Sequence, residues 1–507
     1  MSQPALNPMS LLGYAWLIRE LALAARPLAV ESRLGTRMRT TQKAGGATRH
    51  EYPPQYAPAS DAVGHLEFAL KHEYVDLCLL RDVFLNCGAA PIEAAIRARP
   101  TGRYTRLLGF FYEFTTGQTL DPGLEIGGNY TDALVADECF VSPTPRRNKR
   151  WRVWDNLLGD SRYCPMVRRT PAIVEGLAMP LQDELRGLVA DFPPELFRRA
   201  SDYLYLKETR STYGIENEAM PPADRTRRFV ALLRSAGEGN LAGLLSEAEL
   251  VKRQSLIVDP RYAVPTFREN HNYVGEQRPD YSQRLHYICP PPQWMGSLVA
   301  GLAHSAQRSG GLPALVQAAT VAFGFVFIHP FEDGNGRLHR FLIHDLLHRG
   351  GFVADNVMLP VSATMLRHMP DYDATLEHYS RPLLDGWLAY EMDEEGALTI
   401  TNPEQVEGYY RYPDLTAQTE YLIRTVALSI REDFAEELRF LRGYDAARAA
   451  IREIVDLPDR RLDLLLRLLH QTGGRLAKAK RQQFAEIADE ELERIRTAFT
   501  AAFGPSA

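Results

Sequence analysis

The chain has 507 residues, of which 45% are hydrophobic and 24% charged, and its formal net charge is −6 at pH 7. A single core rarely organises so many residues, so we expect two or three domains of an ordinary globular protein. The acidic balance argues against a general nucleic-acid binder held by bulk electrostatics. Five cysteines without a CxxC pair argue against a zinc ribbon or a disulfide framework, and they favour buried thiols in the reducing cytoplasm.

Residues 1–199 are predicted to form a mostly helical N-terminal domain. The apolar start of the chain lacks a basic beginning and is interrupted by Arg19 and Glu20, so it indicates an amphipathic helix rather than a signal peptide. Apolar residues then recur at helical spacing through residues 65–84. Runs typical of strands are few, which favours a mainly α fold.

Residues 200–385 are predicted to form the central domain, which begins with a helical stretch at 200–219. Residues 259–292 are rich in aromatic and β-branched side chains with turn formers between them, which predicts a β-hairpin. The segment 312–328 has 17 residues and no charge. Because about 20 apolar residues are needed to cross a bilayer, this segment indicates a helix buried in the protein, and no membrane partner is expected.

Residues 386–507 are predicted to form a mostly helical C-terminal domain. Within it, residues 400–416 indicate a linker, and residues 456–499 indicate a helix, a Gly-Gly turn, a basic patch and a second helix. The basic turn is most simply part of a helical pack. A winged-helix-like element is the alternative interpretation, and it would bind DNA with a steep dependence on salt.

The most informative stretch is HPFEDGNGRLHR, residues 329–340, which directly follows the buried helix. Pro330 should end that helix at His329, because a proline disfavours helical backbone at the residue before it. A new helix is expected to start near Gly336, so the DGNG segment forms a tight loop at a helix N-terminus. Glycines let a ligand approach the backbone closely, and the N–H groups of such a loop bind anions.

The polar side chains of this stretch suit the chemistry of nucleotide phosphates. Arg337 and Arg340 lie on neighbouring positions of the first helical turn, and guanidinium groups pair well with phosphate oxygens. Asp333 supplies a carboxylate of the kind that holds Mg²⁺ beside nucleotide phosphates. His329 stands at the entrance of the loop, with an ordinary pKa of about 6.5 that suits a general base near neutral pH. These side chains together point to nucleotide phosphoryl chemistry.

At every specified position, residues 329–340 resemble the signature of Fic domains, HxFx(D/E)GNGRxxR. The resemblance implies an all-helical core with a β-hairpin flap. It implies transfer of the AMP part of ATP to a Ser, Thr or Tyr hydroxyl of a protein, with pyrophosphate leaving and Mg²⁺ as cofactor. Related toxins that act as kinases carry Lys in place of Gly336, which disfavours phosphate transfer. A looser similarity along the chain is to a large bacterial group of Fic-family proteins.

The resemblance also implies a role for each residue of the signature. His329 would deprotonate the target hydroxyl, Phe331 would anchor the loop in the core, and Asp333 would bind Mg²⁺. A hairpin at about 270–288 would be the flap, which docks the target segment as an added strand. The phosphates of ATP would be held by the remaining residues, which are Gly334, Asn335, Gly336, Arg337 and Arg340.

A second match lies upstream of the signature, in the segment STYGIENE at residues 211–218. Thr212, Glu216 and Asn217 resemble the inhibitory motif (S/T)xxxE(G/N) of self-inhibited Fic proteins. The resemblance implies a helix that brings Glu216 to Arg340 and so removes the cation meant for the γ-phosphate. The alternative interpretation is a solvated helix face.

Other functions stay open from the sequence alone. The same site would serve a Fic-fold transferase that uses another nucleotide donor, or one that removes AMP from a protein. A chain unable to turn over ATP would instead be a nucleotide-sensing, DNA-binding regulator. The HDLLH segment at residues 344–348 is similar to the HExxH of zinc proteases, with Asp345 in place of Glu, although a solvated helix face is the simpler interpretation.

Overall fold

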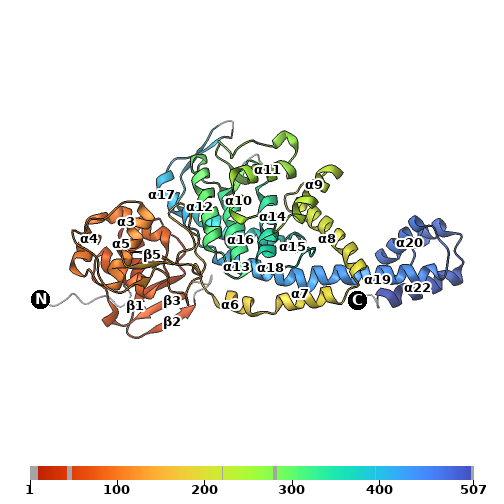
Figure 1. Cartoon of the computed structure of the whole chain (residues 1–507), viewed down its shortest axis with the longest axis horizontal. Helices are drawn as coiled ribbons and strands as arrows, with labels where there is room; N and C mark the ends of the chain where they lie inside the picture. Colours follow the sequence, from red (N-terminus) through yellow and green to blue (C-terminus); the bar gives the residue numbers. More distant parts are fainter. Residues whose placement is uncertain are drawn as a thin grey trace. The chain divides into compact units, whose positions relative to one another are not determined.

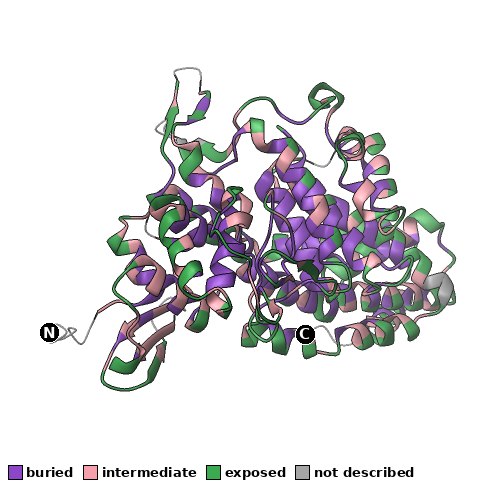
Figure 2. Ribbon diagram, turned by 60° about the vertical axis from the view of Figure 1, so that its left-hand side comes forward, coloured by how far each residue is buried: buried purple, intermediate pink, exposed green. Residues whose placement is uncertain are grey.

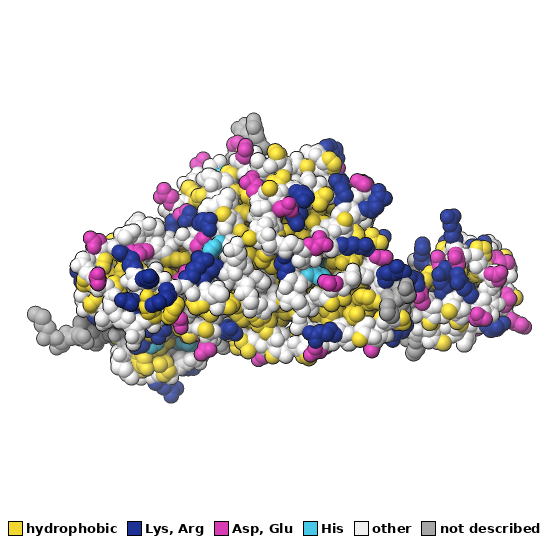
Figure 3. Space-filling view, in the orientation of Figure 1, with side chains coloured by type: hydrophobic (Ala, Val, Ile, Leu, Met, Phe, Trp, Pro, Cys, Tyr) yellow, Lys and Arg dark blue, Asp and Glu magenta, His cyan; other side chains and the backbone are white. Residues whose placement is uncertain are grey.

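The chain is mainly α-helical, and its described residues also form four small β-sheets (Figure 1). The computed structural model describes residues 10–24, 26–42, 48–219, 221–277, 283–393 and 396–503. The predicted fold class, a helical core with a β-hairpin and helical regions before and after it, is confirmed. On the face drawn in Figure 3, Lys and Arg side chains are interspersed with Asp and Glu. Among the described residues, no helix has the length and apolar character of a membrane span.

The chain divides into two compact units, each assembled from separate segments. The first contains residues 1–179, 221–352 and 368–424, and the second contains residues 180–220, 353–367 and 425–507. Two segments of the second unit therefore interrupt the chain of the first. The sequence-based division into three consecutive domains is a different partition, and it stays a prediction.

The N-terminal part of the first unit begins with a short helix, α1 (Gly13–Glu20), followed by a sheet. The strands of this sheet are β1 (Val30–Leu34), β2 (Arg39–Gln42) and β3 (Thr48–Tyr52). β3 lies between the other two, parallel to β1 and antiparallel to β2. Within the described residues, the amphipathic helix predicted for the start of the chain is shorter than expected.

Four helices and a second sheet complete this N-terminal part. The helices are α2 (Ala62–His72), α3 (Leu77–Cys87), α4 (Ala89–Ala98) and α5 (Arg103–Thr116). The strands are β4 (Thr131–Asp132), β5 (Arg146–Asn148) and β6 (Val153–Asp155), with β6 in the middle. The helical pattern of residues 65–84 belongs to two helices, because the carboxylate of Asp76 starts α3 by accepting from the N–H of Leu79 at 2.8 Å.

The central part of the first unit is a group of helices around α13 (Ala314–Ile328). Every residue of α13 from Leu315 onward is buried, and the helix packs against α12 (Met295–Arg308) and α14 (Asn335–Arg349). Buried residues gather in the central helices of Figure 2. The predicted buried helix is therefore confirmed.

The remaining part of the first unit contains further helices and hairpins. The helices are α6 (Pro171–Ala178), α9 (Ala223–Arg234), α10 (Leu241–Leu244), α11 (Glu247–Ile257), α16 (Met369–Gly386) and α18 (Thr416–Leu428), whose last residues belong to the second unit. Of these, α9, α10 and α11 contact α12 or α14. The hairpins pair β7 (Tyr273–Gln277) with β8 (Gln283–Ile288) and β9 (Tyr390–Met392) with β10 (Leu398–Ile400).

Residues 400–416, predicted as a linker, contain a packed helix, α17 (Pro403–Arg411). This helix contacts α3, where the buried Arg81 donates to the carbonyl of Glu404 at 3.2 Å and pairs with the carboxylate of Glu407. The linker prediction is wrong because its turn-forming residues flank a short amphipathic helix rather than a loop.

The second unit is built on two long helices, α8 (Pro194–Ile215) and α19 (Ala435–Arg452). α8 contacts both α19 and α15 (Val361–Arg367). At the second contact, the buried carboxylate of Glu208 accepts from the N–H of Ser362 at 2.9 Å. The unit also contains α7 (Leu181–Ala190) and a π-helical turn at Ser429–Phe434.

The C-terminal helices of this unit enclose an apolar core of their own. They are α20 (Asp459–Gln471) and α22 (Asp489–Phe503), packed with α19, and the short α21 (Lys478–Arg481) lies between them in the chain. Gly473 and Gly474 follow α20 with φ values of 62° and 87°, which confirms the predicted Gly-Gly turn between helices. The winged-helix-like alternative for this region stays a prediction.

Candidate active site

The buried helix α13 ends at the histidine of the signature loop. His329 adopts a left-handed backbone conformation (φ 55°, ψ 58°), and its N–H donates to the carbonyl of Phe325 at 2.9 Å. A non-glycine residue in this conformation costs on the order of 1–3 kcal/mol, so the contacts around His329 must hold it there. The next helix, α14, begins at Asn335. The predicted helix break and the restart near Gly336 are both confirmed.

The imidazole of His329 has a defined orientation and charge. Its Nδ1 lies 3.0 Å from the carbonyl oxygen of Val326, so Nδ1 carries the proton and Nε2 keeps its lone pair. Burial lowers the pKa of His329 from its usual 6.5 to about 4, and the charge of Arg268 acts in the same direction. At neutral pH the ring is therefore uncharged and can accept a proton at Nε2.

The side chain of Asn335 closes the loop. Its Oδ1 accepts from the N–H of Phe331 at 3.0 Å, and its Nδ2 donates to the carbonyl of the same residue at 2.7 Å. The ring of Phe331 is fully buried and meets that of Phe267 edge-on, with centroids 5.6 Å apart, so Phe331 anchors the loop as expected. Because its side chain is used in the loop, Asn335 has only its backbone N–H to offer a phosphate.

The N-terminus of α14 requires glycine at Gly334. The residue has a φ of 94°, and a Cβ atom there would lie 3.0 Å from Cγ1 of Val258. The first hydrogen bond of the helix runs from the N–H of Leu338 to the carbonyl of Gly334 at 3.0 Å. The backbone N–H groups of Asn335 and Gly336 precede that bond, so they belong to the helix end that attracts anions.

Asp333 and Arg337 form an ion pair at the same helix end. The guanidinium of Arg337 is buried and also donates to the carbonyl of Ile257 at 3.3 Å, whereas the side chain of Asp333 is 38% exposed. The amide of the buried Gln254 holds the carbonyl of Asp333 at 3.2 Å. Arg340 lies one turn further along α14 and is buried as well. Both arginines of the signature are thus buried in the first turns of α14, next to the loop.

The β-hairpin predicted as the flap is present, with β7 and β8 antiparallel and a register shift between Val274 and Gly275. Residues 278–282 of its tip lie outside the described residues. The root of β8 is fixed in the core, because the hydroxyl of Tyr287 donates to the carbonyl of Phe327 and that of Tyr410 donates to the carbonyl of Ile288 at 2.7 Å.

Two residues outside every motif of the sequence join the flap to the loop. Arg268 donates from Nε to the carbonyl of His329 at 2.8 Å, and Asn272 donates from Nδ2 to the carbonyls of Phe331 and Glu332, each at 3.3 Å. They lie 61 and about 60 residues before their partners, so no local motif could have pointed to them.

The residues of the inhibitory motif lie at the end of α8. Thr212 is a buried residue of this helix, which ends at Ile215, and Glu216 directly follows as the C-cap. Asn217 has a left-handed backbone with a φ of 55°. This segment belongs to the second unit and the signature loop to the first, so the pairing of Glu216 with Arg340 stays a prediction.

The acid of the HDLLH segment has a structural task. Asp345 is buried, pairs with Arg349 at 2.5 Å and accepts from the N–H of Gly237 at 2.8 Å. Arg349 in turn donates to the carbonyl of Gly239 at 2.7 Å. Asp345 thus fixes the glycine-rich loop before α10 to the end of α14 and is not placed as a base.

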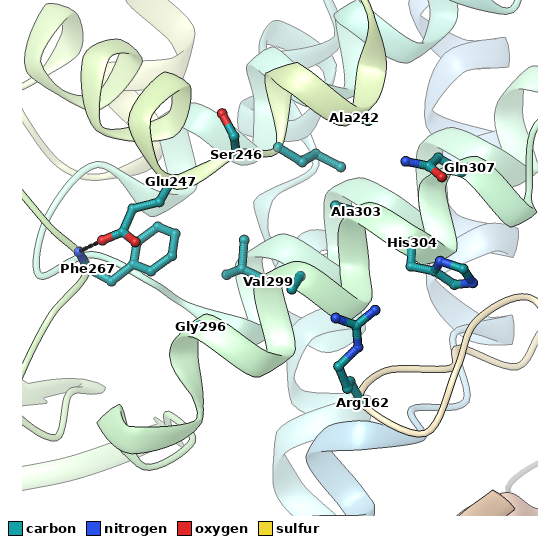
Figure 4. A pocket seen from close by; sticks show the side chains of 12 residues that line it. Arg162, Ala242, Ser246, Glu247, Phe267, Gly296, Val299, Ala303, His304 and Gln307 are labelled. Atoms are coloured by element: carbon teal, nitrogen blue, oxygen red, sulfur yellow. Dashed lines mark hydrogen bonds between the residues drawn. The ribbon is translucent and has the colours of Figure 1, made fainter.

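A cavity of about 440 Å³ lies between α12 and the segment that runs from α10 to the start of α11 (Figure 4). Its walls include Phe267, whose N–H donates to the carboxylate of Glu247 at 3.2 Å (dashed line in Figure 4). Arg162 and His304 reach the opposite side. Nothing in the sequence indicated this cavity, because it is lined by residues far apart in the chain.

The fold and the loop together define a helical domain in which an uncharged imidazole stands beside a helix N-terminus suited to phosphate. Residues 244–347 match the model of the Fic/DOC family. The chain therefore contains a Fic domain, at residues 244–347.

Among curated proteins, the chain is 35% identical over 183 residues to the protein adenylyltransferase Fic of Drosophila virilis, an alignment that covers 31% of this chain and 35% of that protein. It is 28% identical over 182 residues to the protein adenylyltransferase Fic of Drosophila ananassae, which covers 31% of this chain and 34% of that protein. The chain matches 34–35% of the length of these two relatives, and 16% of a third, from Drosophila mojavensis.

Two solved structures are also similar. One is a Fic family protein from Desulfovibrio desulfuricans, with a TM-score of 0.35 and 19% identity, covering 67% of this chain and 85% of that chain. The other is a Fic domain containing signaling protein from Bacteroides thetaiotaomicron, with a TM-score of 0.34 and 18% identity, covering 52% of this chain and 97% of that chain.

Proposed function

We propose that this chain transfers AMP from ATP to a Ser, Thr or Tyr hydroxyl of a protein, with Mg²⁺ as cofactor. The observation that carries the proposal is the uncharged imidazole of His329, oriented by Val326, at the entrance of a loop that opens a helix at Gly334. The names of the relatives, protein adenylyltransferase Fic, support the same activity. A cytoplasmic location, where ATP is available and thiols stay reduced, belongs to the proposal.

In the proposed step, Nε2 of His329 takes the proton of the target hydroxyl, and the hydroxyl oxygen forms a bond to the α-phosphorus of ATP. The bond from that phosphorus to the oxygen leading to the β-phosphate breaks, and pyrophosphate leaves with the electron pair. The imidazolium then gives its proton to water. A general base of this kind contributes typically ~10²–10⁴-fold to the rate.

The triphosphate would lie along the N-terminus of α14. The N–H groups of Asn335 and Gly336 would bind its α- and β-phosphates, Arg337 the β-phosphate end and Arg340 the γ-phosphate. Asp333 would hold Mg²⁺, because its half-exposed carboxylate lies beside this helix end, where phosphate oxygens and water would supply the other ligands. When bound, the ion neutralises charge on the phosphates and on the leaving pyrophosphate.

The target would bind along the flap. A free strand edge can pair with an extended segment through its backbone, which brings a hydroxyl side chain near the imidazole without requiring a particular sequence. The flap is suited to this because its root is fixed by Tyr287 and by Arg268, while residues 274–276 of β7 are exposed. The target includes the chain itself, if one of its own segments reaches the flap.

Self-inhibition by Glu216 is part of the proposal, supported by the motif and by its position directly after α8. A carboxylate that pairs with Arg340 would neutralise the cation needed for the γ-phosphate. ATP would then bind with its α-phosphorus out of line for attack. Thr212, one helical turn before Glu216, is buried and would fix the helix end.

The test compares Glu216→Gly protein with the Glu216→Gly/His329→Ala double variant, each incubated with Mg²⁺ and ATP labelled at the α- or the γ-phosphate. We expect α-label in the protein or in lysate proteins, no γ-label, and a loss of at least about 10²-fold in the double variant with ATP binding retained. Transfer of the γ-label would identify a kinase. Unchanged labelling in the double variant would remove His329 from the mechanism. Competition by GTP, CTP and UTP identifies the donor.

A further inference from the structure

Arg268 is a buried cation at the root of the flap. Its guanidinium donates to three backbone carbonyls, those of His329 at 2.8 Å, Asn270 at 2.7 Å and Pro290 at 2.5 Å. Among the described residues, no carboxylate forms an ion pair with it. Burial lowers the pKa of Arg268, as expected for a charge that has left water without a counter-ion.

The three carbonyls come from three parts of the site. His329 belongs to the signature loop, Asn270 to the segment that enters β7, and Pro290 to the segment that leaves β8. The backbone N–H of Arg268 also donates to the carbonyl of Pro330 at 2.9 Å. A single residue therefore fixes both roots of the flap to the residue proposed as the base.

His329 depends on this contact. Its N–H and Nδ1 bond to α13, but its carbonyl turns out of the helix and is held by Arg268. Without that bond, the peptide between His329 and Pro330 is free to rotate away from the left-handed conformation, which the residue does not favour by itself. The imidazole would then move relative to both the flap and α14.

We propose that Arg268 is a positioning residue, which holds the imidazole of His329 and the flap in register so that a hydroxyl on the flap meets Nε2. The inference rests on the proposed transfer activity and adds a residue to its site. It predicts that removing the Arg268 side chain lowers the rate of the transfer step and leaves ATP affinity unchanged, because Arg268 donates to backbone carbonyls of the loop and of the flap.

The chain offers a matched control in Arg106, which is equally buried and also donates to three carbonyls, those of Gly102, Asn129 and Arg152, at 3.3, 2.7 and 3.0 Å. Arg106 lies in α5, among the N-terminal helices. Arg106→Ala and Arg268→Ala should therefore lower thermal stability to a similar extent, whereas only Arg268→Ala should change the transfer reaction.

The experiment uses the full-length Glu216→Gly protein as the parent and measures ATP affinity, transfer rate and stability. For Arg268→Ala we expect unchanged ATP affinity and a transfer rate lower by about 100-fold, the typical effect of a displacement near 1 Å. Guanidinium ion at millimolar concentration should restore part of the rate, by filling the space left by the side chain. Arg268→Lys keeps the positive charge but cannot reach three carbonyls as the guanidinium does, so its transfer rate should also be low.

The pH dependence of the transfer rate distinguishes a positioning role of Arg268 from a role in folding alone. The charged groups that act on His329 are Arg268 and Asp333, with burial as the larger effect. Losing the charge of Arg268 should move the acid limb of the transfer rate of Arg268→Ala to higher pH, whereas Arg268→Lys should keep the parent limb. Equal rates for the parent, Arg268→Ala and Arg106→Ala would overturn the inference, and so would an equal loss in both alanine variants.

If the Glu216→Gly parent protein shows no transfer activity, the proposed function is refuted. The positioning role of Arg268 is then tested by a second measurement, hydrogen exchange. Hydrogen exchange of Arg268→Ala should then increase at residues 270–272 and 329–332, and that of Arg106→Ala should not. Unchanged exchange at those residues would overturn the positioning role itself.

Discussion

Replacing Asn335 with alanine tests whether the signature loop is held by that one side chain. The amide makes two hydrogen bonds to the backbone of Phe331, at 3.0 and 2.7 Å, and it is buried. Each bond contributes about 1 kcal/mol, and a buried group left without a partner costs about 1–3 kcal/mol. We therefore expect Asn335→Ala to lower the free energy of unfolding by about 2–5 kcal/mol, and ATP affinity to fall because the loop loses its shape.

Asn156 provides the matched control, because its amide brackets a single residue in the same way. It accepts from the N–H of Leu134 at 2.9 Å and donates to the carbonyl of Leu134 at 3.0 Å, and it is buried as well. Calorimetric unfolding of the two alanine variants should show similar losses, whereas titration with ATP should be affected only by Asn335→Ala. The reasoning fails if Asn335→Ala unfolds like the parent, or if both variants bind ATP equally well.

Three further predictions concern the loop. The pKa of His329 is lowered to about 4, so the ring stays uncharged well below pH 6.5. The transfer rate of the Glu216→Gly protein should therefore fall, on acidification, with a midpoint closer to pH 4 than to pH 6.5. A midpoint at pH 6.5 in initial-rate measurements would contradict this prediction. Gly334→Ala should lower the free energy of unfolding by about 1–3 kcal/mol, because the φ of Gly334 is 94° and the added Cβ would lie 3.0 Å from Val258. Gly351→Ala should lower it less, because Gly351 has a φ of 64° and open space around the added Cβ. Equal losses in thermal unfolding would show that the side chain of Val258 moves aside. Asp333→Asn should raise the Mg²⁺ concentration needed for half-maximal transfer by at least about tenfold, and an unchanged Mg²⁺ titration would assign the ion to other residues.

The signature loop was predictable because its backbone is set by its own residues. Pro330 disfavours helix at the position before it, and Gly334 allows a φ of 94° that other residues avoid, so both breaks follow from side chains within the loop. The buried helix before it was predictable for the same reason, since seventeen uncharged residues have no polar face. The phosphate roles of the loop remain predictions.

Contacts between distant segments could not be predicted. Arg268 looks in the sequence like any solvated arginine, and only the fold brings it to a carbonyl 61 residues away. The helix α17 was missed because its packing depends on Arg81, 323 residues before Glu404. The end of α8 shows the same limit, because the sequence supplies the motif around Glu216 but not its distance from the loop.

The burial of α13 from Leu315 onward has a consequence for how the signature loop takes its shape. A helix with no exposed face cannot be stable before the helices around it have enclosed it, and the residue at its end takes its position only then. A chain still being made, or one that has lost part of its core, therefore carries no oriented imidazole. Under the proposed transfer activity, only fully folded copies would therefore modify a target hydroxyl.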